Sequence, residues 1–202
     1  MTRPVRVVKL GGSLLEWPEL AVRLRAWLAV QPPAVNVMIV GGGALVDKLR
    51  ELDAASAFAP ETSHWLAIRA MSITAAAVAR LIPEARLVEA IEQLEFSESG
   101  SLQILDAQQF LSQEHGSADA LPASWDVTSD SIAARVATIM GASELVLLKS
   151  SLPSDATNLE SLARSGYVDA YFPRAAKSLV VRCVNLRSED FPEVTADQAK
   201  KC

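Results

Sequence analysis

Three short segments of the sequence combine residue types that suit the binding of a phosphate group: Lys9–Ser13, Gly41–Gly43 and Lys149–Ser151. Glycine lets backbone amides approach a ligand closely, and amides at the start of a helix attract anions. Lysine adds a compact positive charge. Because each segment follows a stretch typical of a buried strand, we expect all three at one edge of a sheet, where open α/β sheets bind their ligands.

Neither glycine segment matches an established phosphate-binding motif. Both lack the pattern G-x-x-x-x-G-K-[ST], and Val46 stands where a dinucleotide-binding fingerprint has its third glycine. A glycine pair after a strand also suits a plain tight turn, and a lysine there also suits a solvated strand end. Residue types and spacing alone therefore predict an anion-binding α/β domain and no particular reaction.

The elements that must position these segments alternate along the chain. Continuous apolar runs predict buried strands at 6–10, 35–40, 85–91, 102–105, 144–149 and 178–186. Helical spacing and turn signals predict helices from Pro18 to about residue 30, then at 43–54, 61–82, 106–114, 128–141 and 158–166. Thr62 or Ser63 is the expected N-cap of the long alanine-rich helix. This alternation favours an α/β fold with a largely parallel sheet, and we expect one domain over residues 1–202.

Composition limits the class of protein. The chain has 202 residues, of which 50% are hydrophobic, and a formal net charge of -5 at pH 7, which argues against sequence-independent nucleic-acid binding. No apolar stretch approaches the roughly 20 residues that span a bilayer. Cys183 and Cys202 lack metal-ligand spacing, and the N-terminus lacks a secretory pattern. We therefore expect a cytoplasmic protein that binds neither nucleic acid nor membrane.

Three motifs together carry a family resemblance. "VVKLGGSLL", "VMIVGGGALVD" and "DVTSDSIAARVA" occur in this order and resemble the amino acid kinase superfamily, which includes acetylglutamate, aspartate, uridylate and isopentenyl phosphate kinases. The resemblance extends from residue 5 to about residue 150. It implies a three-layer α-β-α sandwich, an ATP-dependent kinase that uses Mg²⁺, and a homo-oligomer.

The resemblance also implies a role for each motif. Lys9 would stabilise the negative charge on the phosphoryl group while it is transferred, and Asp130 would orient catalytic lysines. Asp130 also has a simpler interpretation, since an aspartate in the first turn of a helix offsets the helix dipole. The residues next to the nucleotide phosphates would be Gly11, Gly12 and Ser13. The residues facing the acceptor substrate would be Gly41, Gly42 and Gly43.

Four further residues are assigned with alternatives left open. Lys149 would meet the donor phosphates, or it is a solvated strand end. His64 would grip a phosphate on the acceptor, or it is a surface histidine near a helix start. Asp126 would pair with an ammonium group on the acceptor, or it is a plain loop residue; Thr128, in the same stretch, is assigned to the acceptor with it. No residue is assigned as a metal ligand.

The sequence departs from the family pattern in the nucleotide half, which is shorter and lacks a glycine-methionine-lysine segment. The second catalytic lysine of acetylglutamate kinase therefore has no clear match. Either Lys149 or Lys177 replaces it, or the activity is low. The chain resembles a compact subgroup of this superfamily in its short length and in the segments "SHWLAIRAM", "DVTSDSIAA" and "GYVDAYFP". That subgroup includes the kinase of methanofuran biosynthesis, which phosphorylates (5-(aminomethyl)furan-3-yl)methyl phosphate.

Two functions follow as hypotheses. The first is an ATP-dependent kinase whose acceptor is a phosphate monoester or a carboxylate, with the aminomethylfuran phosphate as one candidate. The second is a non-catalytic nucleotide- or oxoanion-binding storage protein on the same fold, in which a missing lysine would be tolerated. ATP binding with turnover would distinguish the first from the second.

Overall fold

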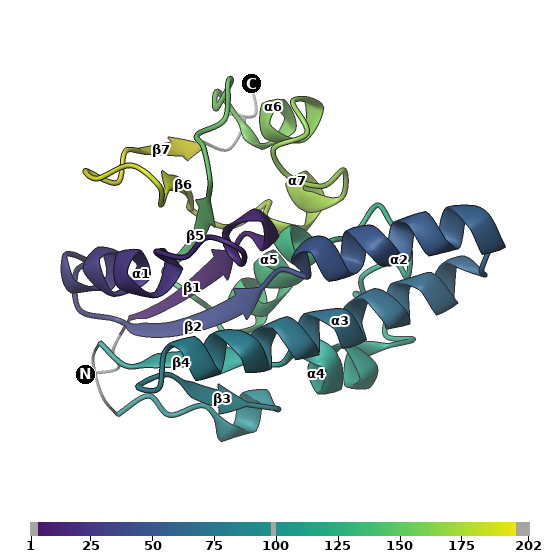
Figure 1. Ribbon diagram of the computed structural model, residues 1–202, viewed down its shortest axis with the longest axis horizontal. Helices are drawn as coiled ribbons and strands as arrows, with labels where there is room; N and C mark the ends of the chain where they lie inside the picture. Colours follow the sequence, from purple (N-terminus) through teal and green to yellow (C-terminus); the bar gives the residue numbers. More distant parts are fainter. Residues whose placement is uncertain (1–3, 98–99, 197–202) are drawn as a thin grey trace.

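The computed structural model describes residues 4–97 and 100–196; Cys202 lies outside them. Its described strands form a seven-stranded sheet in the order β3-β4-β2-β1-β5-β6-β7 (Figure 1). The strands are β1 (Val5–Leu10), β2 (Val35–Val40), β3 (Arg86–Val88), β4 (Leu102–Leu105), β5 (Glu144–Lys149), β6 (Val181–Asn185) and β7 (Glu193–Ala196). Neighbouring strands are parallel, except that β6 and β7 are antiparallel.

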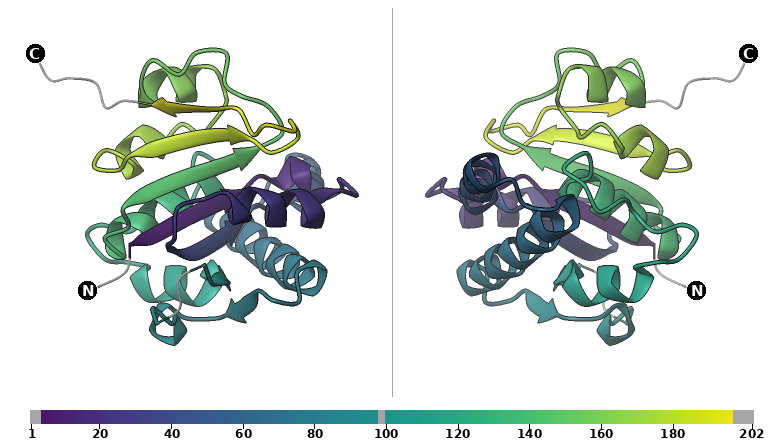
Figure 2. Two further views of the ribbon diagram at one scale, coloured as in Figure 1. Left: turned by 90° about the vertical axis from the view of Figure 1, so that its left-hand side faces the viewer. Right: turned by 90° about the vertical axis from the view of Figure 1, so that its right-hand side faces the viewer.

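Helices cover both faces of the sheet (Figure 2). They are α1 (Leu20–Ala29), α2 (Gly43–Ser56), α3 (Pro60–Leu81), α4 (Ala107–Glu114), α5 (Ser129–Ile139), α6 (Leu159–Arg164) and α7 (Phe172–Ala175), with short 3₁₀ turns at Gly12–Leu14 and Ile91–Gln93. One core lies under α4, α5, α6, α7 and the first half of α3. The other lies under α1 and the second half of α3. The expected three-layer sandwich with a largely parallel sheet is therefore confirmed.

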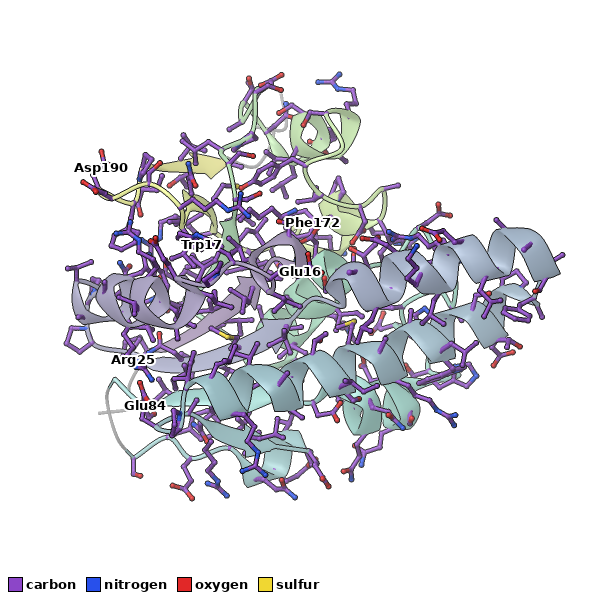
Figure 3. All side chains as sticks on the ribbon, in the orientation of Figure 1. Glu16, Trp17, Arg25, Glu84, Phe172 and Asp190 are labelled. Carbon is purple, nitrogen blue, oxygen red and sulfur yellow. The ribbon has the colours of Figure 1, made fainter. Side chains whose placement is uncertain are left out.

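The α2–α3 pair extends away from the sheet as an antiparallel hairpin (Figure 1). None of the α2 side chains is buried, because this helix packs against α3 on one side and faces solvent on the other. At the opposite end of α3, Arg25 on α1 and Glu84 lie beside each other as an ion pair (Figure 3). None of the helices in the described residues is long and apolar enough to cross a membrane.

The strands predicted at 35–40, 102–105 and 144–149 are observed with these bounds, because each is a short apolar run buried on both faces. The N-cap prediction for the long helix was wrong. The helix begins earlier, at Pro60 with Ala59 as N-cap, because proline suits the first helical position and needs no hydrogen bond from its nitrogen. Thr62 and Ser63 therefore lie inside its first turn.

The edge elements also differ from the predictions. The strand expected at 85–91 is only Arg86–Val88, since this edge strand pairs on one side alone, with β4. The strand expected at 178–186 is Val181–Asn185. The chain then reverses and adds the antiparallel strand β7, which was not predicted. The short helix α7, which precedes β6, was not predicted either.

Candidate active site

Lys9 and Lys149 rise from the same face of the sheet. Successive side chains along a strand point to opposite faces, so Lys9 shares its face with Val7, and Lys149 shares its face with Leu147. Val7 and Leu147 belong to the core that α5 covers. Because β1 and β5 are neighbours, with Lys9 opposite Leu147, both ammonium groups reach the N-terminus of α5.

Asp130 joins these two lysines. The Thr128 side chain caps α5 by accepting a hydrogen bond from the backbone N–H of Asp130, which holds Asp130 in the first turn. Its Oδ1 lies 2.8 Å from Lys9 Nζ, and its Oδ2 lies 3.0 Å from Lys149 Nζ. Lys9 and Asp130 are each only 5% exposed. One buried carboxylate thus bridges two lysines, one with each oxygen.

The charges of this cluster do not cancel, because two lysines share one carboxylate. Burial opposes the charged form of Asp130, but Lys9 and Lys149 outweigh it, and the pKa of the carboxyl lies below its ordinary value. Burial lowers the pKa of the Lys149 ammonium, and the nearby charge of Lys9 lowers it further. A buried excess of positive charge is costly unless an anion joins it, so the cluster is suited to binding one.

The two glycine loops meet beside this cluster. The Gly11 N–H donates to the Leu148 carbonyl at 2.8 Å, and the Gly41 N–H donates to the Leu10 carbonyl at 2.9 Å. A Cβ on Gly12 would lie 2.5 Å from the backbone nitrogen of Gly43, so no larger residue fits there without movement. Gly43 itself has φ +55°. Glycine is therefore required by close approach at one loop and by backbone conformation at the other.

A cleft of about 210 Å³ opens next to these loops, between α2, α3 and α5. Of the residues predicted to bind ligand, Gly12, Ser13, Gly41, Gly42, Gly43, His64 and Thr128 line it. Apolar side chains also line it, among them Val46, Ile68 and Met71. Ser129, the neighbour of Asp130, also lines the cleft, so the charged cluster lies directly behind one wall.

His64 lies in the cleft and is 6% exposed, so it is not a surface residue. Burial lowers the pKa of its imidazole and outweighs a hydrogen bond with the Ser124 backbone that favours the cation. At neutral pH the ring is therefore uncharged. The uncharged ring can offer a hydrogen bond to an acceptor, and its predicted contact with a phosphate on the acceptor stays a prediction.

Asp126 is not part of the cleft lining, and its side chain is exposed. Its neighbour Trp125 lines the cleft instead, and the indole N–H donates to Asp53 Oδ2 on α2 at 2.6 Å. Arg50 lies over the same ring, 5.0 Å from its centroid. These contacts hold the loop that precedes α5 against α2, so that this loop forms one wall of the cleft.

The sequence patterns did not single out Asp47 and Arg50, which line the cleft from α2. A signal for them was present, because both follow Gly43 at helical spacing and so share the helix face that faces the glycine turn. Arg50 Nη1 lies 3.3 Å from Asp47 Oδ1. The cleft lining therefore includes one group of each charge.

Lys149 and Lys177, the two candidates for the second catalytic lysine, are separated by the fold. Lys149 contacts Asp130, as described above. Lys177 is exposed and lines a different pocket with Arg135 and Arg174. Within the described residues, the structure brings together Lys9, Asp130 and Lys149 alone as the lysine–carboxylate cluster at this edge.

Comparisons with known proteins support the fold. Residues 4–151 match the model of the Amino acid kinase family. The fold is similar to UMP kinase from Ureaplasma parvum, with a TM-score of 0.61 at 14% identity over 95% of this chain and 93% of that one. It is also similar to uridylate kinase from Archaeoglobus fulgidus, with a TM-score of 0.58 at 17% identity over 88% of each chain.

A larger enzyme shares the fold too. Aspartate kinase from Synechocystis has a TM-score of 0.61 at 17% identity over 98% of this chain and 41% of that one. No curated protein gives a significant sequence match. At these identities the solved structures establish the fold, and the family match covers both glycine loops, Asp130 and both lysines of the cluster.

Proposed function

Because the chain belongs to the amino acid kinase family, we propose that it is an ATP-dependent phosphotransferase acting on a small-molecule acceptor. The observation that carries this proposal is the carboxylate of Asp130, which holds Lys9 and Lys149 beside the two glycine loops. Phosphoryl transfer asks a protein for positioning and charge stabilisation more than for covalent chemistry. The cluster supplies both.

The donor side of the site comprises Gly11, Gly12, Ser13 and Lys149. The net positive charge of the cluster fits a nucleotide phosphate, and Gly12 and Ser13 line the adjoining cleft. ATP with Mg²⁺ is the proposed donor. When bound, Mg²⁺ neutralises charge on the phosphate oxygens, which bind it readily themselves.

Each residue of the cluster has a distinct proposed role. Lys9 stabilises negative charge on the transferred phosphoryl group. Asp130 holds both ammonium groups and stays ionised, since its pKa is lowered by the two lysines despite its burial. Lys149 takes the place of the second catalytic lysine. None of these groups needs to act as a nucleophile, because an anionic acceptor is already able to attack.

The acceptor proposed for the cleft is a phosphate monoester or a carboxylate. The amides of Gly42 and Gly43, at the start of α2, suit its reacting anion, and the apolar side chains that line the cleft suit a short carbon body. Among the residues that line the cleft, the Asp47 carboxylate suits an ammonium group. The aminomethylfuran phosphate of the compact subgroup combines these features, so it belongs among the first acceptors to be tested.

Binding and turnover of ATP test the proposal directly. We expect ATP with Mg²⁺ to bind in calorimetry, and a screen of phosphate monoesters and carboxylates to identify an acceptor that consumes ATP. Tight ATP binding without turnover on any acceptor would instead favour the non-catalytic storage hypothesis. The homo-oligomeric state and the cytoplasmic location expected from the sequence stay predictions, of which light scattering tests the first.

Lys9→Ala is the first mutational test. We expect kcat to fall by roughly a hundredfold or more, as is usual when a donor to the transition state is lost. The matched control is Lys48→Ala, which removes an exposed lysine that pairs with Glu51 on α2. The control should keep wild-type kcat. Near-wild-type turnover in Lys9→Ala would remove this lysine from the mechanism.

A further inference from the structure

The carboxylate of Asp169, in the segment that leads to α7, lies against the N-terminus of α5. Its Oδ2 accepts hydrogen bonds from Thr128 Oγ1 at 2.8 Å and from the backbone N–H groups of Thr128 and Ser131 at 3.0 Å each. Its Oδ1 accepts from Ser131 Oγ at 2.5 Å and from the backbone N–H of Tyr171 at 3.1 Å. These donors flank Asp130 on both sides.

The same segment also holds Lys149. The Lys149 ammonium donates to the backbone carbonyl of Tyr167 as well as to Asp130 Oδ2. It lies 4.5 Å from the centroid of the Tyr167 ring, a position that adds a cation–π contact. Residues 167–169 therefore contact both partners of one ion pair: the carbonyl of Tyr167 binds the cation, and Asp169 binds the helix turn that carries the anion.

We propose that Asp169 is a positioning residue, and that residues 167–169 hold Asp130 and Lys149 in the geometry that the reaction needs. Asp169 does not line the cleft, and its two oxygens already accept five hydrogen bonds, so it acts through α5 and not on a substrate. A negative charge at a helix N-terminus is favourable, which keeps the first turn of α5 in place. The kinetic part of this inference rests on the proposed function; the structural part does not.

Asp169→Asn tests the proposal with little change in shape. The asparagine side chain keeps one acceptor oxygen, but its NH₂ group faces two of the groups that now donate to Asp169. The first turn of α5, which carries Asp130, therefore loses hydrogen bonds. We expect kcat to fall roughly tenfold to a hundredfold, because small misplacements of catalytic groups have effects of this size. The KM values for ATP and for the acceptor should change less than kcat, because the hydrogen bonds of the Asp169 side chain reach Thr128 in the cleft lining but not the α2 and α3 side of the cleft.

A second readout needs no substrate. The pKa of Lys149 is measured from its side-chain ¹⁵N signal, which is assigned by its loss in Lys149→Met. Burial is the largest cause of the lowered pKa of Lys149. Release of the 167–169 segment would expose the ammonium group and raise its pKa, whereas displacement of Asp130 would lower it, so we expect the pKa of Lys149 to shift in Asp169→Asn. A merely structural role far from the cluster would not move this value.

Asp106→Asn is the matched control. Asp106 also caps a helix, accepting from the Gln108 N–H at 3.0 Å and from Ser72 Oγ at 2.7 Å, but it serves α4. We expect this variant to lose stability while keeping kcat and the Lys149 pKa. Should Asp169→Asn fail to fold, Ser131→Ala removes one donor to Asp169 and should lower kcat and shift the Lys149 pKa, each by less.

The outcomes separate this inference from the proposed function. Folded Asp169→Asn or Ser131→Ala with wild-type kcat and an unchanged Lys149 pKa would overturn the positioning role. If the wild-type protein turns over no acceptor at all, the proposed function fails. The titration of Lys149 then still decides whether Asp169 positions the cluster.

Discussion

Among single residues, the position of Asp130 decides what Lys9 and Lys149 can do. Each lysine alone would be expelled toward water from so buried a place, because an isolated ammonium group is costly to bury. The shared carboxylate keeps both inside, 2.8 Å and 3.0 Å from its oxygens. The pairing of Lys9 with Asp130 could be predicted from the motifs. Lys149 was expected at the same sheet edge, but its contact with Asp130 could not be predicted, because that contact depends on which strand lies next to β1.

The pH dependence of activity tests the charge of Lys149. Burial lowers its pKa, so its proton is lost at a lower pH than from an ordinary lysine, and kcat/KM should decline on the alkaline side below the ordinary lysine range. Asp130, with a lowered pKa, stays ionised across this range and adds no alkaline limb. The measurement is kcat/KM between about pH 7 and pH 11.

Lys149→Arg identifies the group responsible for the alkaline limb. A guanidinium keeps its proton in this range, so the decline should move to higher pH, even if the maximal rate is lower. Lys177→Arg is the matched control and should leave the profile unchanged, because Lys177 lies at a separate pocket. An alkaline limb that stays in place in Lys149→Arg would assign it to another group.

Among the elements, the adjacency of β1 and β2 brings the two glycine loops into contact. The strands run parallel in register, with Leu10 opposite Val40, so their ends fall at the same level and the turns that follow must share space. The two turns fit into this space because Gly12 and Gly43 have no side chains. The sequence predicted both turns, but their mutual contact depends on the order of strands in the sheet.

Gly12→Ala tests that contact. The added Cβ would lie 2.5 Å from Gly43 N and 2.6 Å from Gly43 Cα, so the two loops must move apart. We expect a loss of about 1–3 kcal/mol in the free energy of unfolding, as for other overpacked sites. We also expect a fall of roughly tenfold in kcat/KM from the displaced loops. Urea unfolding and steady-state kinetics measure the two effects.

Gly116→Ala is the control for Gly12→Ala. Gly116 has φ +84°, and a Cβ there would meet no heavy atom within 4 Å. Alanine should therefore lower stability by roughly 1–2 kcal/mol through backbone strain alone. Activity should not change. Equal activity in the two variants would mean that the close approach of the loops does not matter for function.

For the whole molecule, the site depends on parts of the chain that are distant in sequence. The family match ends at residue 151, yet Tyr167 and Asp169 beyond it hold Lys149 and α5. A pattern search along the chain finds motifs but not this convergence, since it arises only when β6 pairs with β5 and carries the preceding segment back to the sheet. Asp169 was missed for that reason.

The same contacts predict that the chain unfolds as one unit. β5 pairs with both β1 and β6, and Phe172 and Leu162 from the later part belong to the core that α5 covers. The aromatic residues allow a clean test, because all four tryptophans precede residue 151 and both tyrosines, Tyr167 and Tyr171, follow it. Tryptophan fluorescence therefore follows one part of the chain. The ¹⁹F signals of incorporated fluorotyrosine follow the other.

We expect the two probes to give one urea midpoint, since coincident transitions are the signature of cooperative two-state unfolding. Neither part can keep its core without the other: loss of the later segment would expose the β6 side of β5, and loss of the earlier one would leave β6 without its parallel neighbour. If the tyrosine signals changed at a lower urea concentration than the tryptophans, the segment after residue 151 would be a separate, weaker unit. The support that Tyr167 and Asp169 give to the cluster would then be lost before the rest of the fold.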